Sequence, residues 1–391
     1  MKRNAKFLCV VVGTMMGLSL LSGCAKKQVV TTGGTTSKAD IIIGAVLPMT
    51  GDIATFGESS KNALELLKEQ VNKDGGVNGS KIDFKYEDDE NKPANSPNAA
   101  SKLIDKYKVV GLIGSVSSKC SIAMGPIATA AKIPMITSTS TNAEVTTKGG
   151  EYVFRACFID PFQGTVLAQF ASEDLKGKTA AALYDVGNDY CKGLADNFEI
   201  GFKKAGGTLV AKETYNAGDK DFKAQLTKIK GLNPDVILLP DYYNTVGLIT
   251  KQARDLGIKA IFLGGDGWDS EDLPKVAGDS IEGGYFSNHY SPDSTDAVVV
   301  QFKKDYSAKY AGKVPDALAA LAYDAGKIMV EALKKANSTD GAKLKDAIKA
   351  TNAQLVSGKV TYDANRNPIK GAVIIKMVGG KQTFVKTVNP K

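Results

Sequence analysis

Short apolar runs alternate with segments of helical periodicity along most of this chain, and this alternation limits the folds that it can adopt. The run from Ile41 to Leu47 is continuous and ends at Pro48, as expected of a strand buried on both faces of a parallel sheet. Residues 58–73 then carry apolar side chains at helical spacing. Strands and helices that alternate in this way predict parallel sheets covered by helices on both faces.

The alternation occurs twice, with a new start after about residue 150. The expected strands are 41–47, 81–87, 109–113 and 133–136 in the first run, and 152–157, 179–184, 208–215, 235–239 and 260–263 in the second. The expected helices between them are 58–73, 95–107, 121–131, 161–175, 190–205, 221–230 and 243–256. Two successive runs predict two similar α/β lobes. The later segments are too few for a third domain and should complete these two; they are helices at 296–311, 316–336 and 342–350 and strands at 359–362, 372–377 and 383–388.

The first residues have the pattern of an export signal. A basic start leads into the apolar stretch Phe7–Leu20 and then to Leu21-Ser22-Gly23-Cys24. About fourteen apolar residues are fewer than the about twenty that a membrane span needs. Small residues before a cysteine resemble the lipobox of bacterial lipoproteins. We therefore expect a signal peptide at 1–23, a lipidated Cys24 and a flexible tether, rich in Thr, Gly and Lys, up to residue 39. The alternative is a generic signal peptide with an incidental cysteine.

Charge and motifs exclude several classes of function. Part of the net charge of +8 comes from the signal segment, and the remaining basic excess is scattered, so no nucleic-acid partner is expected. No nucleotide-binding motif is present. The single histidine, His289, excludes His-rich metal sites and nearly excludes Ser-His-Asp or Cys-His catalysis. The acidic clusters at 88–90 and 269–272 are typical of solvated loops. We therefore expect no catalytic residues, metal or cofactor, and no enzymatic activity.

The cysteines predict a fold without disulfides. Of the five in the chain, Cys9 lies in the signal segment and Cys24 is the expected lipidation site. Cys120, Cys157 and Cys191 remain, an odd number without metal-site spacing. The stability of the exported protein should therefore come from its buried core.

Candidate ligand-binding residues follow the strands, because open α/β sheets bind ligands at the carboxyl ends of their strands. In the first run, the loop 114–121 directly precedes a helix, and Thr137-Ser138-Thr139-Ser140-Thr141 places five hydroxyls in a row. Each could simply cap a helix, but together they could surround a carboxylate. In the second run, strand ends carry the segments 184–190, 241–243 and 264–268, which contain tyrosines and Asp266. Aromatic side chains with an acid suit a small amphiphile with a positive group, although ordinary surface loops are the alternative.

An ordered set of short motifs extends over about 40–380. It comprises 43–44, 48–57, 72–79, 88–89, 113–114, 133–137, 154–155, 160–164, 221–222, 323–325 and 361–363. With these motifs the chain resembles the periplasmic-binding-protein type 1 family, in particular the leucine/isoleucine/valine-binding branch of ABC-transporter receptors. The resemblance implies two doubly wound parallel-sheet lobes joined by a three-crossing hinge. Lobe 1 would comprise 40–158 plus 290–368, and lobe 2 would comprise 159–289 plus 369–391.

The resemblance also implies roles for individual residues. Ser118 and Thr139 correspond to residues that hold the ligand carboxylate, and Thr141 to one that helps to bind its ammonium group. Tyr190 and Tyr242 match tyrosines of the second lobe that close over the ligand.

Three further positions bear on the ligand's charge and side chain. Asp266 occupies the position of an ammonium-binding acid that is often the longer Glu. Phe56 and Leu318 fall at positions facing the ligand side chain, and Leu318 departs from the aromatic residue of some members. Some members also have a disulfide that ends just before Ser118, but Ser117 stands there in this chain.

The function implied is that of a monomeric extracytoplasmic component of an ABC importer, lipid-anchored at the outer face of the cell membrane. It would capture an amino acid, branched-chain or otherwise aliphatic, by closure of the two lobes, and present it to a membrane permease. Two alternatives stay open: the same fold could bind an amide, urea, short-chain acid or aromatic compound, or the protein could be the ligand-sensing subunit of a membrane signalling system.

Overall fold

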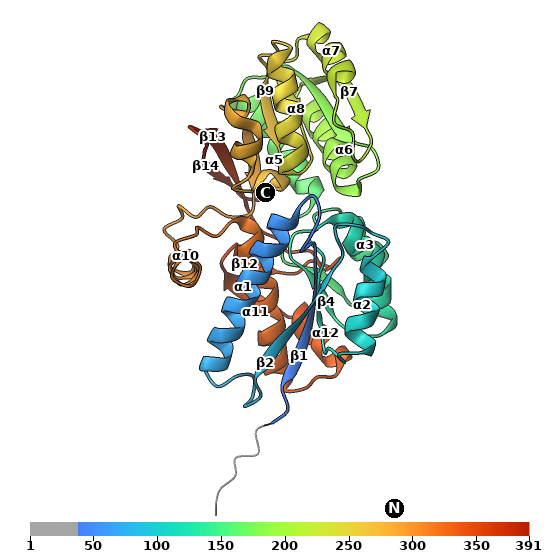
Figure 1. Ribbon diagram of the computed structural model, residues 1–391, viewed down its shortest axis with the longest axis vertical. Coiled ribbons are helices and arrows are strands. Elements are labelled where there is room, and N and C mark those ends of the chain that lie inside the picture. The colour runs from blue at the N-terminus through green and yellow to red at the C-terminus, as the bar shows by residue number, and fades with distance from the viewer. Residues whose placement is uncertain (1–37, 391) are drawn as a thin grey trace, which may run out of the picture. The chain divides into compact units, whose positions relative to one another are not determined.

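The computed structural model describes residues 38–390 (Figure 1). The predicted signal peptide 1–23, Cys24 and residues 25–37 of the predicted tether lie outside the described residues. Within 38–390, no helix has both the length and the apolar composition that a membrane span requires.

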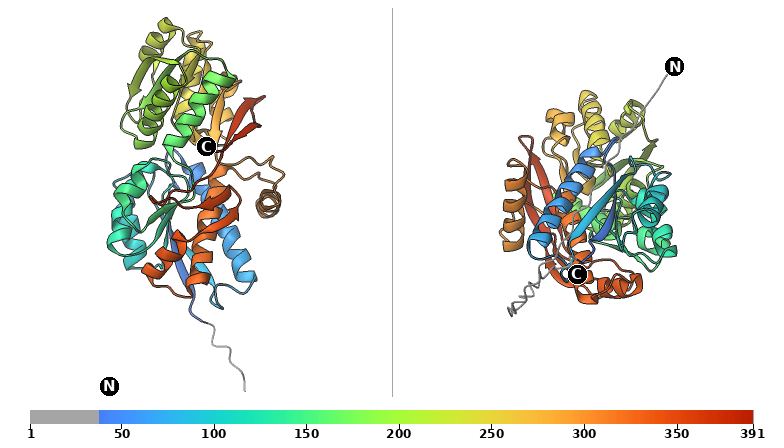
Figure 2. Two further views of the ribbon diagram at one scale, coloured as in Figure 1. Left: turned by 180° about the vertical axis from the view of Figure 1, so that it is seen from behind. Right: turned by 60° about the horizontal axis from the view of Figure 1, so that its bottom comes forward.

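The first sheet is parallel and has five strands in the order β2-β1-β3-β4-β5. Its strands are β1 Ile41–Leu47, β2 Ile82–Asp88, β3 Leu112–Gly114, β4 Met135–Thr137 and β5 Val153–Arg155. The helices associated with it are α1 Ala54–Lys73, α2 Ser96–Asp105, α3 Ser118–Ala130, α4 Glu144–Gly149, α11 Ala317–Ala336 and α12 Gly341–Lys349. Seen from either side, α11 and α12 lie in the same lobe as α1 (Figures 1 and 2).

Alternation along β1 explains why helices cover both faces of this sheet. Ile43, Ala45 and Leu47 belong to the core that includes apolar side chains of α1 and α11. Val46 belongs to a separate cluster with residues of α2 and α3. Because successive side chains of a strand point to opposite faces, an unbroken apolar run supplies both cores.

The second sheet has seven strands in the order β14-β13-β10-β9-β8-β6-β7. They are β6 Thr179–Asp185, β7 Thr208–Tyr215, β8 Val236–Leu238, β9 Ile261–Gly264, β10 Tyr285–Asn288, β13 Ala372–Val378 and β14 Lys381–Val388. The helices of this part are α5 Asp160–Gln169, which continues as a π-helical turn Phe170–Asp174, α6 Asp189–Lys204, α7 Lys223–Leu232, α8 Tyr243–Asp255 and the short α9 Leu273–Ala277. Two 3₁₀ turns, Asp266–Trp268 and Gly278–Ile281, flank α9, while α10 Ala297–Lys309 and the hairpin of β11 Asn352–Leu355 and β12 Gly358–Thr361 follow later in the chain.

The chain passes between the parts that carry the two sheets after β5, after β10 and before β13. The predicted fold class, two α/β lobes with a three-crossing hinge, is therefore confirmed. The predicted lobe boundaries stay a prediction. The second sheet is not entirely parallel, because β13 and β14 add to it as antiparallel strands.

Several elements differ from the expected ones for identifiable reasons. α3 begins at Ser118 rather than at residue 121, because its first turn is polar and shows no apolar period. The strand β10 and the short helices α4 and α9 were not predicted. β10 follows Gly283-Gly284 and contains two polar residues within four, so neither its length nor its pattern indicates a strand.

The three described cysteines, Cys120, Cys157 and Cys191, are buried free thiols. Burial raises the pKa of Cys120 to about 11 and that of Cys157 to about 12. The thiolate is the form that reacts in disulfide exchange, so these thiols should be unreactive in the folded protein.

We expect a reducing agent to leave the melting temperature of the protein unchanged within a few degrees. The reason is that a structure held by core burial loses nothing on reduction, whereas removing a native disulfide costs about 2–5 kcal/mol. Calorimetric scans with and without dithiothreitol measure this directly. A fall of about 10 °C or more on reduction would contradict the prediction.

Candidate functional site

A small cavity lies between residues of the two lobes. Its lining consists of Phe56, Val116, Ser118, Thr139 and Leu318 from the first lobe with Tyr190, Tyr242, Asp266 and Gly267 from the second. The cavity measures ≈ 20 Å³, close to the volume needed by one water molecule. The lobes are therefore closed over the site in this structure. All the residues predicted to bind ligand line this cavity except Thr141.

Hydrogen bonds between the lobes accompany this closure. The Asn142 side-chain amide donates to the carbonyl oxygen of Asp189 at 2.7 Å. The backbone N–H of Ala317, in the first turn of α11, donates to the Asp269 carboxylate at 2.7 Å. Each bond links one lobe to the other, so opening the cleft would break both.

Hydroxyl groups at the ends of β3 and β4 form the first-lobe side of the site. The Ser118 hydroxyl, at the start of α3, accepts the backbone N–H of Asn142 at 3.1 Å. The Thr139 hydroxyl donates to the carbonyl oxygen of Val116 at 3.0 Å. The N-terminus of a helix and nearby hydroxyls are suited to an anion, so this side could receive a carboxylate.

Thr141 lies beside the cavity rather than on it. It is fully buried, and its carbonyl oxygen accepts the backbone N–H of Asp160 at 2.9 Å. Within the described residues, its hydroxyl has no hydrogen-bond partner, and neither has either carboxyl oxygen of Asp160. Burial raises the pKa of Asp160 to about 8, so this carboxyl group is a neutral neighbour of Thr141 at neutral pH.

The Arg155 side chain holds the hydroxyl-rich loop after β4 through hydrogen bonds to its backbone. Its guanidinium is fully buried and donates to the carbonyl oxygens of Ser140 at 2.6 Å and Asn142 at 3.0 Å. Two such bonds from one rigid fork hold the intervening Thr141 in place. In the sequence, Arg155 stands out only as part of a family motif.

Aromatic rings from both lobes form the walls of the cavity. The rings of Tyr190 and Tyr242 are stacked with centroids 5.5 Å apart, and Phe56 meets Tyr242 edge-on at 6.0 Å. The Tyr190 hydroxyl accepts the backbone N–H of Gly267 at 3.2 Å. A β-carbon on Gly265 would lie 2.4 Å from this hydroxyl oxygen, so the close approach of Tyr190 requires glycine there.

Asp266 supplies a carboxylate to the second-lobe side. Its side chain follows β9 in the turn Asp266–Trp268. One carboxylate oxygen accepts the Gln163 amide N–H at 2.9 Å, and the other lies 3.0 Å from Nε2 of His289. Asp266 is 8% exposed and lines the cavity, so a positive group in the cavity could contact it.

Gln163 and His289 are functional candidates that the sequence analysis missed. In the sequence, Gln163 stands only within a family motif, and the single histidine, His289, bears only on metal and catalytic sites. Both lie far from Asp266 in sequence, on α5 and after β10. No local pattern connects them to it; the one available signal was the rarity of histidine itself.

Comparison with known protein families identifies the chain. A family model described as periplasmic binding protein matches residues 40–382. The chain belongs to the periplasmic binding protein family. This periplasmic binding protein is 33% identical over 330 residues to Leu/Ile/Val-binding protein homolog 3 of Brucella melitensis, a match that covers 83% of the chain and 87% of the relative.

Two solved structures support the same placement of this periplasmic binding protein. It is similar to a leucine binding protein from Thermotoga maritima, with 38% identity, a TM-score of 0.86 and coverage of 90% of this chain and 99% of the other. It is also similar to a branched-chain amino acid transporter substrate binding protein from Streptococcus pneumoniae, determined in complex with isoleucine. For that structure the identity is 33%, the TM-score 0.84 and the coverage 90% and 100%.

Proposed function

We propose that this protein is the extracytoplasmic solute-binding component of an ABC importer and that its ligand is a branched-chain or other aliphatic amino acid. The observation that carries the proposal is the composition of the cavity between the lobes. It combines the Asp266 carboxylate on one side, the Ser118 and Thr139 hydroxyls on the other, and the apolar side chains of Phe56 and Leu318. The relatives and solved structures described above support this ligand class.

The ligand would bind mainly to the first lobe before the cleft closes. Its carboxylate would lie at Ser118 and Thr139, where the start of α3 adds backbone N–H groups. Its ammonium group would face Asp266, and its side chain would lie against Phe56 and Leu318. Tyr190 and Tyr242 would close over it. Because such a ligand contacts both lobes only when they are closed, its binding shifts the population to the closed form.

Calorimetric titration with a matched set of ligands tests this proposal. We expect isoleucine, leucine or valine to bind, and 4-methylpentanoate and 3-methylbutylamine to bind much more weakly. The first of these two lacks the ammonium group of leucine, and the second lacks its carboxylate. The single tryptophan, Trp268, lies two residues after Asp266 and offers a fluorescence signal for the same titrations.

Two other outcomes would replace the proposal. Binding of 4-methylpentanoate, benzoate, urea or a simple amide in preference to the amino acids would assign a different solute to the same site. Amino-acid binding without any loss of cellular uptake on gene deletion would favour a ligand-sensing subunit over a transport component. A permease in the membrane is the partner that the transport function requires, and we propose that the binding protein acts as a monomer.

We further propose that lipid on Cys24 anchors the exported protein, and we expect the Cys24→Ser variant to be left uncut or released. The wild-type protein should sediment with membranes and partition into detergent, because more than one acyl chain on a residue gives stable anchoring. Cell fractionation followed by Triton X-114 partitioning compares the two. If both proteins fractionate identically as soluble species, the lipoprotein interpretation is wrong.

A further inference from the structure

His289 and Gln163 hold the Asp266 carboxylate from outside the lining of the ligand cavity. Gln163 donates to one carboxylate oxygen at 2.9 Å, while Nε2 of His289 lies 3.0 Å from the other. Neither residue lines the ligand cavity, whereas Asp266 does. Each carboxylate oxygen can accept more than one hydrogen bond, so Asp266 retains acceptor capacity for a ligand.

The His289 ring is itself held in a fixed orientation. It stacks on Phe158 with centroids 3.7 Å apart, and its backbone N–H donates to the Asn288 side chain at 2.8 Å. Nδ1 is buried and has no partner within the described residues. The tautomer that fits these contacts carries its proton on Nε2 and donates it to Asp266.

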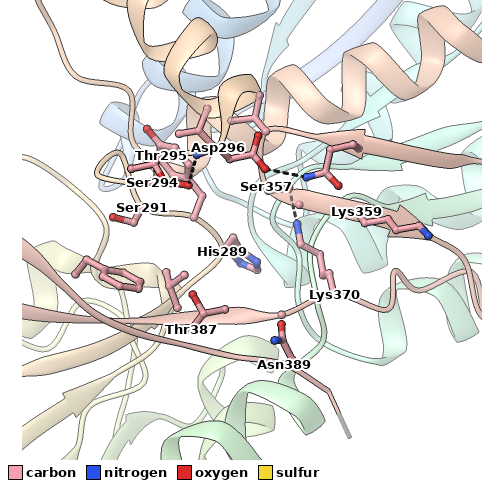
Figure 3. A pocket seen from close by; sticks show the side chains of 18 of the residues that line it. His289, Ser291, Ser294, Thr295, Asp296, Ser357, Lys359, Lys370, Thr387 and Asn389 are labelled. Carbon is pink, nitrogen blue, oxygen red and sulfur yellow. Dashed lines mark hydrogen bonds between the residues drawn. The ribbon is translucent and has the colours of Figure 1, made fainter.

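His289 also lines a second and larger cavity on the hinge side of the molecule. This cavity measures ≈ 790 Å³ and is bounded by segments that include Ser291, Asp296, Ser357, Lys370 and Asn389 (Figure 3). Its lining is rich in polar side chains. His289 therefore contacts Asp266, which lines the ligand cavity, and itself borders a second, polar cavity.

We propose that His289 is a positioning residue for the ligand's ammonium site and that its protonation weakens ligand binding at acidic pH. This inference rests on the proposed function, because it requires a ligand with an ammonium group at Asp266. A neutral His289 orients the carboxylate and leaves its charge for the ligand. A protonated His289 pairs with the same carboxylate and competes with the ammonium group.

The charged groups around His289 set the direction of this effect. Burial lowers the pKa of His289 below its ordinary value, and the Asp266 carboxylate opposes this shift. Of the more distant charges, Lys370 lowers the pKa of His289 and Asp269 raises it. Burial also lowers the pKa of Lys370 to about 8 and raises that of Asp269. At neutral pH the ring is therefore neutral. A bound ammonium group beside Asp266 should lower the pKa of His289 further, so ligand binding and protonation oppose each other.

The single histidine of the chain makes the first measurement direct. In protein purified without a polyhistidine tag, NMR titration of the lone imidazole resonance gives its pKa with and without isoleucine. We expect saturation with isoleucine to lower this pKa by about one unit or more, which corresponds to about a tenfold coupling. An unchanged pKa on saturation would overturn the proposal.

The second measurement compares the pH dependence of isoleucine affinity in the wild type and in His289→Gln. In the wild type the Kd should rise as the pH falls through the pKa of His289 and then level off, and the total rise should equal the coupling given by the NMR shift, about tenfold for a shift of one unit. Glutamine keeps an N–H donor but cannot be protonated. The variant should bind isoleucine about two- to tenfold more weakly at neutral pH and show a flat profile in the acidic range.

A control variant, Asn389→Ala, separates this effect from other causes. Asn389→Ala alters the lining of the hinge-side cavity without touching Asp266, and it should keep the wild-type profile. Asp160, whose pKa burial raises to about 8, is protonated throughout the acidic range and so adds no slope there. If His289→Gln keeps the wild-type pH profile, the proposal fails while the amino-acid function stands. If the wild type binds no aliphatic amino acid at any pH, the proposed function itself fails.

Discussion

The Asp266→Ala variant is expected to lose at least about thirtyfold, and up to several thousandfold, in affinity for its amino-acid ligand. The estimate follows from the cost of about 2–5 kcal/mol when a desolvated charge pair loses one partner. Asp266 is buried, and its carboxylate is held at the cavity by Gln163 and His289. Its loss would leave the ligand's ammonium group without a counter-charge in a closed site.

Asp266→Asn should weaken binding nearly as much, because it preserves the shape of the side chain and removes its charge. The amide can still accept the Gln163 N–H, so the variant should fold normally. Isothermal titration calorimetry with isoleucine measures both variants, and circular dichroism checks the fold.

Asp272→Asn is the matched control for these two variants. Asp272 lies in the same loop region but pairs at the surface with Lys275, which is largely exposed. Exposed ion pairs contribute at most about 1 kcal/mol, so this variant should bind isoleucine within about threefold of the wild type. If both Asp266 variants also bind the natural ligand within about threefold of the wild type, that ligand carries no ammonium group at this site. A carboxylate-only or amide ligand would then be favoured.

The components of the site that sequence could predict are those that local rules place. Parallel strands end at one edge of a sheet, so the loops after β3 and β4 had to bring Ser118 and Thr139 close together. The same rule places Asp266 after β9. Apolar continuity in β1 predicted a strand buried on both faces, and the structure has it there.

The components that sequence could not predict depend on the crossings between the lobes. His289 lies beside Asp266 because the chain leaves the second sheet for the first lobe directly after β10. Gln163 lies beside Asp266 because α5 begins just after the first crossing between the lobes. Thr141 lies beside the cavity because Arg155 and Asp160 fix its backbone. These contacts join segments with no common periodicity, and only the packed structure brings them together.

Trp268→Ala is expected to lower the free energy of unfolding by about 3–5 kcal/mol, the usual cost of truncating a buried aromatic side chain to alanine. Trp268 ends the turn that carries Asp266 and is fully buried. Its indole N–H donates to the carbonyl oxygen of Leu239 at 3.0 Å, and its ring lies against Phe286 of β10. A β-carbon on Gly264 would lie 2.0 Å from the indole, so the ring packs directly on the end of β9.

Trp268→Phe should cost less, about 1–2 kcal/mol, because most of the ring volume stays and no buried acceptor is left unpaired. The carbonyl oxygen of Leu239 still accepts the backbone N–H of Asp241 at 2.9 Å. Urea unfolding followed by circular dichroism is the appropriate measurement, since both variants lose the tryptophan signal.

Val300→Ala provides the control, because Val300 is 52% exposed on α10 and should change stability by no more than about 0.5 kcal/mol. The Trp268 indole also supports the turn that positions the Asp266 carboxylate at the cavity. Trp268→Ala should therefore also weaken isoleucine binding under conditions where the variant remains folded. A loss of less than about 1 kcal/mol in Trp268→Ala would contradict the packing argument. Normal affinity in the folded variant would show that Gln163 and His289 suffice to hold Asp266 in place.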